Sequence, residues 1–274
     1  MPRAPRDLLR LYRVADWLHF LPLPLAGWMA RSPRTPRELA GALLAWTGAL
    51  AFMSAVNQAF DDRLDRRAGK NPVGSGFDRA AALRLAVLPA VVAVAASAAL
   101  APAGLGATAA LLVAATVYSA PPRLKRVPVV GTLWNVVIAL PGMVLAGAPQ
   151  SPSPRFATLA ALFAGLLLGS QLLHEAEDRD DDRAGGVTTV AVLFGARGAL
   201  GAALAVVAPL PLAPWLLAPA HPAATIATAL FATGWCAVLA RRVARADTTA
   251  LRQLRLRYRW SALALGAAVF ASVA

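Results

Sequence analysis

The sequence has few of the residues that build disulfides, thiolate metal sites and charged soluble surfaces. Among 274 residues there are one cysteine, three histidines and only 15% charged residues. The single cysteine, Cys236, excludes an intramolecular disulfide, and so small a set of cysteine and histidine argues against a structural zinc site. With 58% hydrophobic residues, the chain is too apolar for an ordinary soluble globular protein. The sequence therefore predicts an integral membrane protein.

Acidic residues are also scarce, and they are unevenly placed. The chain has 14 acidic and 27 basic residues, for a formal net charge of +13. Nine of the acids lie in two short segments: Asp61, Asp62, Asp65, Glu175, Glu177, Asp178, Asp180, Asp181 and Asp182. The positive excess is typical either of a protein with an anionic partner or of the cytoplasmic side of a polytopic membrane protein. The clustering of the acids indicates that they act together.

Long apolar runs recur along the chain. A helix that spans a bilayer needs about 20 mostly apolar residues. Nine stretches meet this description: 14–30, 38–60, 80–100, 103–120, 129–148, 156–177, 196–217, 222–240 and 257–274. Several are rich in alanine and glycine, which favours close helix packing in lipid. We expect an all-α membrane protein of about nine transmembrane helices, forming one domain over residues 1–274 as a single bundle around a central cavity.

The distribution of basic residues predicts the orientation of the chain. When each lysine and arginine is assigned to the nearest segment between apolar stretches, 23 of the 27 fall on one side and 4 on the other. By the positive-inside rule, the N-terminus and both acidic clusters are cytoplasmic, and the C-terminus is outside. This predicts a multi-pass protein of the cytoplasmic membrane. The basic run from Arg241 to Arg259 is attributed to orientation, with anionic lipid contact as a second role.

The two acidic clusters resemble one another. Residues 57–69 can be laid without gaps over residues 174–186, and two aspartates, an arginine and a glycine then coincide. Each cluster ends an even-numbered apolar stretch, the second and the sixth. This placement is what an internal duplication of a four-helix unit would give. The alternative is chance similarity between two charged segments.

Polar residues in both clusters are spaced for a shared helix face. Two sets are spaced by four: Asn57, Asp61 and Asp65, and His174, Asp178 and Asp182. Like charges at this spacing destabilise a helix unless something neutralises them. All-oxygen ligands suit Mg²⁺, which binds through a few carboxylates together with substrate phosphates. The alternative is a pair of solvated segments whose acids balance neighbouring arginines.

Basic residues near the same predicted face fit a diphosphate. They follow the first cluster and open the segment before the fifth apolar stretch: Arg66, Lys70, Arg123, Lys125 and Arg126. Ammonium and guanidinium groups both bind phosphate oxygens. The same residues also count toward the cytoplasmic orientation. We expect no nucleic-acid partner.

Three segments together resemble the UbiA superfamily of intramembrane prenyltransferases. Residues 57–65, NQAFDDRLD, are similar to the family's NDxxDxxxD motif. Residues 178–195, DRDDDRAGGVTTVAVLFG, are similar to its second motif, a DxxxD followed by a GxxTxxVxxG-like stretch, and residues 118–126 resemble its basic loop. The resemblance extends from about residue 10 to 270 in helix number and motif order. Gln58 stands where the family usually has Asp, which leaves one carboxylate fewer; Asp62 and Glu175 are candidates to compensate.

The resemblance implies an enzyme that transfers an isoprenyl group from an isoprenyl diphosphate to a lipophilic or aromatic acceptor in the membrane. Diphosphate is released, and the product belongs to quinone or other isoprenoid lipid biosynthesis. The implied ligands of Mg²⁺ are Asp61, Asp65, Asp178 and Asp182, with Asn57 as a further ligand or as the group that orients a carboxylate. Diphosphate oxygens are implied to bind Arg66, Lys70, Arg123, Lys125 and Arg126.

Two further residues are candidates for substrate contact, and two other functions stay open. Asn135 either lines the acceptor pocket or packs between helices, and Arg13 is expected to reach the substrate from the first apolar stretch. A non-enzymatic transporter is one alternative function, although its charges should lie near mid-helix rather than at helix ends. A phospholipid headgroup transferase is the other, although its Asp-Gly-x-x-Ala-Arg pattern is absent.

Overall fold

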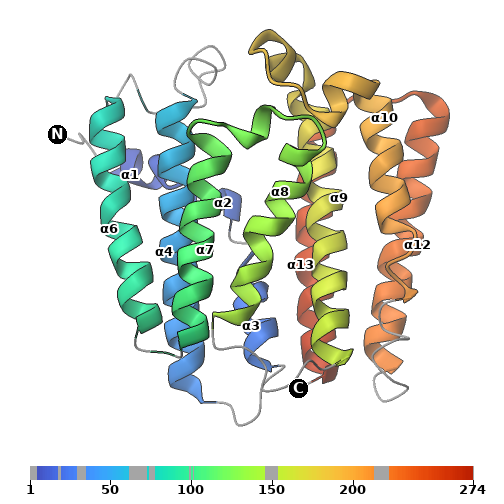
Figure 1. Cartoon of the computed structure of the whole chain (residues 1–274). Helices are drawn as coiled ribbons and strands as arrows, with labels where there is room; N and C mark the ends of the chain where they lie inside the picture. The colour runs from blue at the N-terminus through green and yellow to red at the C-terminus, as the bar shows by residue number, and fades with distance from the viewer. Residues whose placement is uncertain are drawn as a thin grey trace. The chain divides into compact units, whose positions relative to one another are not determined.

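A computed structural model describes most of the chain, and the described part is helical with no β-strand (Figure 1). The described residues are 5–17, 20–29, 35–61, 73, 78–98, 100, 102–145, 154–212 and 222–273. The α-helices are α1 (Pro5–Leu11), α2 (Val14–Trp17), α3 (Pro22–Met29), α4 (Pro36–Phe60), α6 (Arg79–Ala98), α7 (Pro102–Ser119), α8 (Val130–Ala139), α9 (Pro154–Ala184), α10 (Val190–Val207), α12 (Pro222–Arg245) and α13 (Leu251–Val273). Two 3₁₀ helices, η2 (Leu124–Arg126) and η3 (Leu140–Val144), flank α8.

Six of the described helices are long and apolar enough to cross a membrane: α4, α6, α7, α9, α10 and α12. The all-α membrane architecture is thereby confirmed, whereas the count of nine spans, the sides of the membrane and the orientation of the termini stay predictions. The stretch 14–30 is not one continuous helix but the short helices α2 and α3. Proline explains this, because Pro22 lacks an N–H and fits the first position of a new helix rather than the middle of an old one.

The stretch 129–148 also departs from a single long helix. It forms the ten-residue helix α8 and then continues as η3. Pro141 lies at the start of η3, where its missing N–H cannot continue the α-helical hydrogen bonds. The stretch is apolar and helical as predicted, but its described helical part is shorter than the length predicted for a membrane span.

The helix that carries the second acidic cluster is longer than predicted. α9 continues past residue 177 to Ala184, so the cluster lies on the helix itself. The next helix, α10, begins at Val190 rather than at residue 196, and Gly195 interrupts it with φ 75°. This glycine ends the second motif in the sequence, and its left-handed backbone is a conformation that residues with a side chain rarely adopt.

The chain divides into two compact units, each with one acidic cluster. The first unit contains Met1–Leu124 and Val137–Ala148; the second contains Lys125–Val136 and Pro149–Ala274. In the first unit, α4 packs against α6 and α7, and α3 packs against η3. A capping box at Thr35 and Glu38, followed by Pro36, starts α4. The predictions of a single domain and of an internal duplication remain untested.

The second unit packs around α9. This helix contacts α10 and α13, and α12 contacts the same two helices. Between α12 and α13, the rings of Phe231, Trp235 and Tyr258 form edge-to-face and tilted contacts, with the Trp235 and Tyr258 centroids 4.9 Å apart. Tyr258 is fully buried and lies against Gly169 of α9, where a Cβ atom would clash with its hydroxyl. Glycine at 169 therefore permits the close approach of α13 to α9.

Candidate active site

The first acidic motif lies at the end of α4. The backbone N–H of Asp61 donates to the carbonyl oxygen of Asn57 at 2.9 Å, one turn earlier, and Asp61 is 8% exposed. From α7, the hydroxyl of Ser119 donates to Asn57 Oδ1 at 3.1 Å. An amide oxygen has two lone pairs, so this contact is compatible with both roles proposed for Asn57. The structure thus fixes Asn57 beside the first motif aspartate.

Two guanidinium groups surround Phe60, the residue before Asp61. Arg123 Nη2 donates to the Phe60 carbonyl oxygen at 3.0 Å. The Arg79 guanidinium carbon lies 4.3 Å from the centroid of the Phe60 ring, and that of Arg123 lies 6.0 Å from it. Cation–π attraction therefore holds positive charge at the first motif. Arg123 belongs to the predicted basic loop. Arg79 was not identified from the sequence. The only signal for it there is the aromatic residue Phe60 inside the motif, since an aromatic ring can bind a cation.

The amide of Gln58 joins α4 to the end of α1. Its side chain is fully buried, and its Nε2 donates to the carbonyl oxygens of Arg10, at 2.9 Å, and Leu11. These carbonyls lie in the last turn of α1, which leaves C-terminal acceptors unsatisfied. An aspartate could not donate these hydrogen bonds. The amide at position 58 is therefore explained by its role in anchoring α1 to α4.

Several candidate residues of the first motif lie outside the described residues. These are Asp62, Asp65, Arg66 and Lys70. The proposed second carboxylate of this motif and two of the proposed phosphate ligands therefore stay predictions.

The second acidic motif lies on α9 as the four-residue spacing predicts. His174, Asp178 and Asp182 follow one another at one-turn intervals, and His174 Nδ1 lies 3.3 Å from Asp178 Oδ2. Asp182 accepts a hydrogen bond from the Thr189 side chain, and the negative charges of Asp178 and Glu175 act on it more strongly than the positive charge of Lys125. Two carboxylates one turn apart with an ammonium group nearby form a donor set that fits Mg²⁺ together with a phosphate.

The described residues alone do not complete a metal cage. Among them, no three His, Cys, Asp or Glu side chains converge on a position that could hold a metal ion. Mg²⁺ commonly takes only one or two protein carboxylates and completes its octahedral shell with water and phosphate oxygens. The acidic pair on α9 therefore suits a metal that is bound together with a phosphate.

Glu175 is held by hydrogen bonds to its own unit. It is 4% exposed. Its Oε1 accepts from Thr132 of α8 at 2.7 Å and from Gln171 at 3.1 Å, and its Oε2 accepts from the backbone N–H of Val190 at 3.0 Å. Because Val190 begins α10, the carboxylate also lies at a helix N-terminus, where negative charge is favourable. Glu175 therefore joins α8, α9 and α10. Its compensation for the carboxylate that position 58 lacks stays a prediction.

A tight turn carries the chain from α9 to α10. Gly186 has φ 68°, and the N–H of Val187 donates back to the carbonyl oxygen of Asp182 at 2.9 Å. A glycine is favoured at this position because the left-handed conformation is strained for other residues. Thr189 then caps α10 by accepting from the N–H of Val192. The turn thus brings the Thr189 side chain into hydrogen-bonding contact with Asp182.

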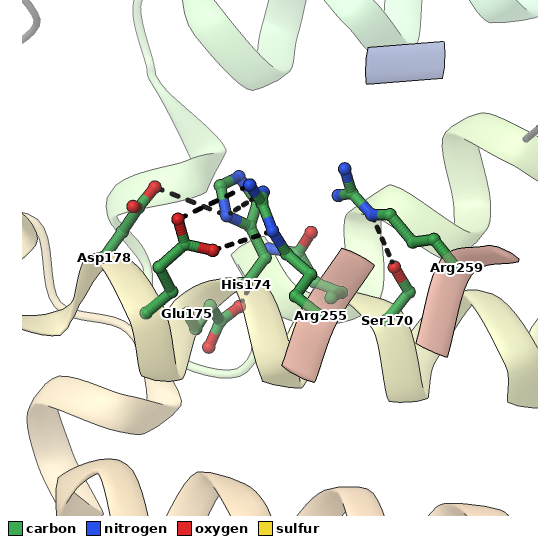
Figure 2. Close-up of polar contacts among 8 residues, drawn as sticks. Ser170, His174, Glu175, Asp178, Arg255 and Arg259 are labelled. Atoms are coloured by element: carbon green, nitrogen blue, oxygen red, sulfur yellow. Dashed lines mark hydrogen bonds and ion pairs between the residues drawn. The ribbon is translucent and has the colours of Figure 1, made fainter. Parts of the chain in front are cut away.

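Two arginines of α13 contact α9 (Figure 2). The sequence attributed both to membrane orientation, so these contacts were not predicted. Arg255 Nε lies 2.7 Å from Glu177 Oε2, and its Nη1 lies 2.8 Å from His174 Nδ1. One turn along α13, Arg259 Nε donates to the Ser170 hydroxyl at 3.1 Å. The four-residue interval between the two arginines, which places them on one face of a helix, was the only signal in the sequence.

The remaining candidate residues lie in η2, in α8 and in the turn between α1 and α2. Lys125 and Arg126 lie in η2, where Arg126 is exposed. The Asn135 amide donates to the Gly131 carbonyl oxygen of its own helix at 3.2 Å. Arg13 lies in the turn between α1 and α2 with φ 47°. No substrate contact of these residues is established by the structure, so their roles stay predictions.

Known proteins match both the sequence and this architecture. A sequence model of the UbiA prenyltransferase family matches residues 20–263, which is most of the chain. The chain belongs to the UbiA prenyltransferase family. This confirms the resemblance carried by the two aspartate motifs and the basic loop. No curated protein matches the sequence directly.

Solved structures of UbiA homologues share the fold. One from Archaeoglobus fulgidus has a TM-score of 0.73 at 20% identity and covers 97% of this chain and 99% of its own. An apo structure from Aeropyrum pernix K1 has a TM-score of 0.73 at 22% identity and covers 95% and 98%. The Archaeoglobus fulgidus homologue has also been solved bound to DMAPP and Mg²⁺, with a TM-score of 0.70, 18% identity and coverage of 95% and 99%.

Proposed function

We propose that this protein transfers an isoprenyl group from an isoprenyl diphosphate to a lipophilic or aromatic acceptor within the cytoplasmic membrane, with Mg²⁺ as cofactor. The proposal rests on one observation above all: Asp178 and Asp182 lie one turn apart on α9, so that two carboxylates share one face of the helix. Membership of the family supports it, as does the homologue bound to DMAPP and Mg²⁺. The donor chain length and the acceptor are left open.

In this mechanism the residues of the chain bind and neutralise the diphosphate. Asp61, Asp65, Asp178 and Asp182 would hold Mg²⁺. Mg²⁺ held by these carboxylates would supply Lewis-acid stabilisation of the diphosphate leaving group. The phosphate oxygens would bind the predicted basic residues: Arg66, Lys70, Arg123, Lys125 and Arg126.

The group transfer itself follows from the chemistry of an allylic diphosphate. The bond between C1 and the bridging oxygen breaks, and its electron pair leaves with diphosphate. The electron-rich acceptor carbon then bonds to C1, and an aromatic acceptor loses a proton to restore its ring. An apolar helical environment suits this step because it excludes the water that would otherwise capture the carbocation. Asn135 is the proposed acceptor contact, and Arg13 is a proposed substrate contact.

Diphosphate release from the purified full chain in lipid nanodiscs tests the proposal. We expect release only when an isoprenyl diphosphate, an acceptor and Mg²⁺ are all present, and loss of release with EDTA. Asp61→Asn and Asp178→Asn should each abolish turnover, because each removes a negatively charged ligand. Asp247→Asn, in the exposed turn between α12 and α13, is the matched control and should retain activity. Full turnover in EDTA, or in both motif variants, would refute the proposal.

A further inference from the structure

The arginines at the turn between α12 and α13 divide into two groups. Seven lie from position 241 to position 259, and the sequence alone attributed all of them to membrane orientation, with lipid contact as a second role. In the structure, three of them contact other parts of the protein. Arg242 forms an ion pair with Asp247, and Arg255 and Arg259 contact α9. The other four are exposed: Arg241, Arg245, Arg252 and Arg257.

The exposed arginines have little negative charge to neutralise them. Asp247 is the only acidic residue from position 241 to position 259, and its Oδ2 lies 3.4 Å from Arg242 Nη1. Among the described residues, no ion pair or side-chain hydrogen bond involves Arg241, Arg252 or Arg257. This end of the helix pair therefore carries an excess of positive charge that an external anion can balance.

The exposed face of α12 changes from apolar to basic toward the turn. The residues at four-residue intervals from Ile226 to Val238 are exposed and uncharged. Arg241 and Arg245 continue this face, three and seven residues after Val238. A helix that faces lipid has this pattern, because its apolar side chains contact the acyl chains and its terminal arginines reach the headgroups.

The exposed face of α13 shows the same change and includes a tryptophan. Arg252, Leu256 and Trp260 lie at four-residue intervals, and Trp260 is 64% exposed. Arg257 lies three residues before Trp260, so the two are neighbours on the helix surface. Tryptophan is enriched where a membrane meets water, since its ring is apolar and its indole N–H is polar. Both arginines lie on the side of Trp260 that is nearer to the turn.

Contacts between the two helices bring their arginines to one level. Trp235 of α12 meets Tyr258 of α13 edge to face, with ring centroids 4.9 Å apart, and its indole N–H donates to the Ser261 hydroxyl. Arg241 lies six residues from Trp235 toward the turn, and Arg252 lies six residues from Tyr258 toward the turn. At 1.5 Å per residue, each is about 9 Å from the aromatic contact. The basic ends of the two faces therefore lie at the same level of the helix pair.

We infer that this basic patch, formed by Arg241, Arg245, Arg252 and Arg257, binds the headgroups of anionic phospholipids, with Trp260 at the boundary between headgroups and acyl chains. The occupant is a lipid rather than a soluble anion because the patch continues an exposed apolar face on both helices. Guanidinium groups bind phosphate oxygens through paired N–H donors. The inference does not depend on the proposed reaction, since none of these residues is a proposed ligand of Mg²⁺ or diphosphate.

Quenching of Trp260 fluorescence by brominated lipids tests the inference on a chain that keeps all its arginines. The full chain is placed in phosphatidylcholine nanodiscs that contain brominated phosphatidylglycerol or, at the same mole fraction, brominated phosphatidylcholine. Subtracting the quenching measured with Trp260→Phe isolates the signal of this residue. We expect the lipid beside Trp260 to be phosphatidylglycerol in preference to phosphatidylcholine, by about fivefold for each arginine that contacts its headgroup.

Removing charge from the basic patch should remove the preference. Arg257→Gln, close to Trp260 on α13, should lower the preference about fivefold, and Arg257→Lys should retain it because the charge remains. The variant with all four arginines of the patch replaced by glutamine should be quenched equally by the two lipids. Arg84→Gln makes the same change of charge at an exposed position of α6 and should retain the preference.

Three results would overturn the inference. Equal quenching by the two lipids in the unaltered chain would show that the patch does not select anionic headgroups. A preference that persists in the four-glutamine variant would show that other charges select the lipid. Absence of quenching by either lipid would show that something other than lipid, such as a second copy of the chain, covers Trp260. The first and third results need no arginine variant, so they decide the matter even if the four-glutamine variant does not fold.

Discussion

Arg123 Nη2 donates a 3.0 Å hydrogen bond to the carbonyl oxygen of Phe60, the residue that precedes Asp61. Phe60 is the last residue of α4, so its carbonyl is one of the acceptors that a helix leaves unsatisfied at its C-terminus. A cation is favoured there. The basic segment after α7 is thus tied to the first aspartate motif through the backbone, independently of any side chain at position 61.

Arg123→Gln should weaken use of the isoprenyl diphosphate. The variant loses both the helix-end hydrogen bond and a positive charge, and a hydrogen bond involving a charged group contributes about 1.5–3 kcal/mol. We expect kcat/KM for the donor to fall about 10- to 100-fold. Steady-state kinetics of diphosphate release measures this. Arg84→Gln, exposed on α6, is the control and should behave as the unaltered chain. An unchanged kcat/KM would contradict the role of Arg123.

The second motif could be predicted because its spacing is local. An interval of four residues specifies one helix face wherever the helix lies, so His174, Asp178 and Asp182 fall together on α9 as expected. Asn57 and Asp61 likewise remain one turn apart, although α4 ends between them at Phe60. Helix boundaries were less well predicted, because a proline within an apolar run changes the helix without changing its hydropathy.

Contacts between residues distant in the sequence could not be predicted from it. Arg255 and His174 are 81 positions apart, and Gln58 and Arg10 are 48 apart. Nothing in the composition near Arg255 distinguishes an arginine that faces α9 from one that orients the chain in a membrane. Likewise, the sequence did not predict that the Gln58 amide donates to α1.

Gln58→Asp should destabilise the protein without improving its metal site. Aspartate restores the residue usual in the family, but it cannot donate to the Arg10 and Leu11 carbonyls, and its charge would be buried against them. The Arg10 carbonyl also accepts from the N–H of Arg13, but leaving the Leu11 carbonyl unsatisfied costs about 1–3 kcal/mol, and more with a charge. We expect a lower Tm and an unchanged Kd for Mn²⁺. Gln58→Met separates loss of the donor from gain of charge and should be the milder variant. Tighter Mn²⁺ binding at unchanged Tm in Gln58→Asp would refute the anchoring role.

Glu175→Ala should reduce stability and leave metal binding intact. The carboxylate accepts from Thr132, Gln171 and the N–H of Val190, and its removal leaves these buried donors without their acceptor. We expect a loss of about 1–3 kcal/mol in the free energy of unfolding. Differential scanning fluorimetry in detergent measures the change in Tm, and Mn²⁺ titration of the folded fraction measures the site. Asp180→Ala, on an exposed position of α9, is the matched control. Loss of Mn²⁺ binding at unchanged Tm would instead identify Glu175 as a ligand.

The contact between Gly169 and Tyr258 predicts that one substitution can compensate for another. Gly169→Ala places a Cβ atom against the Tyr258 hydroxyl, so it should lower the Tm. Among the described residues the hydroxyl has no hydrogen-bond partner, and Tyr258→Phe removes it at little or no cost. The double variant should therefore recover stability that Gly169→Ala loses. Gly201→Ala, in a helical position of α10 with nothing within 4 Å of the new Cβ, should not lower the Tm. Purely additive changes in Tm would show that the hydroxyl does not limit the approach of α13 to α9.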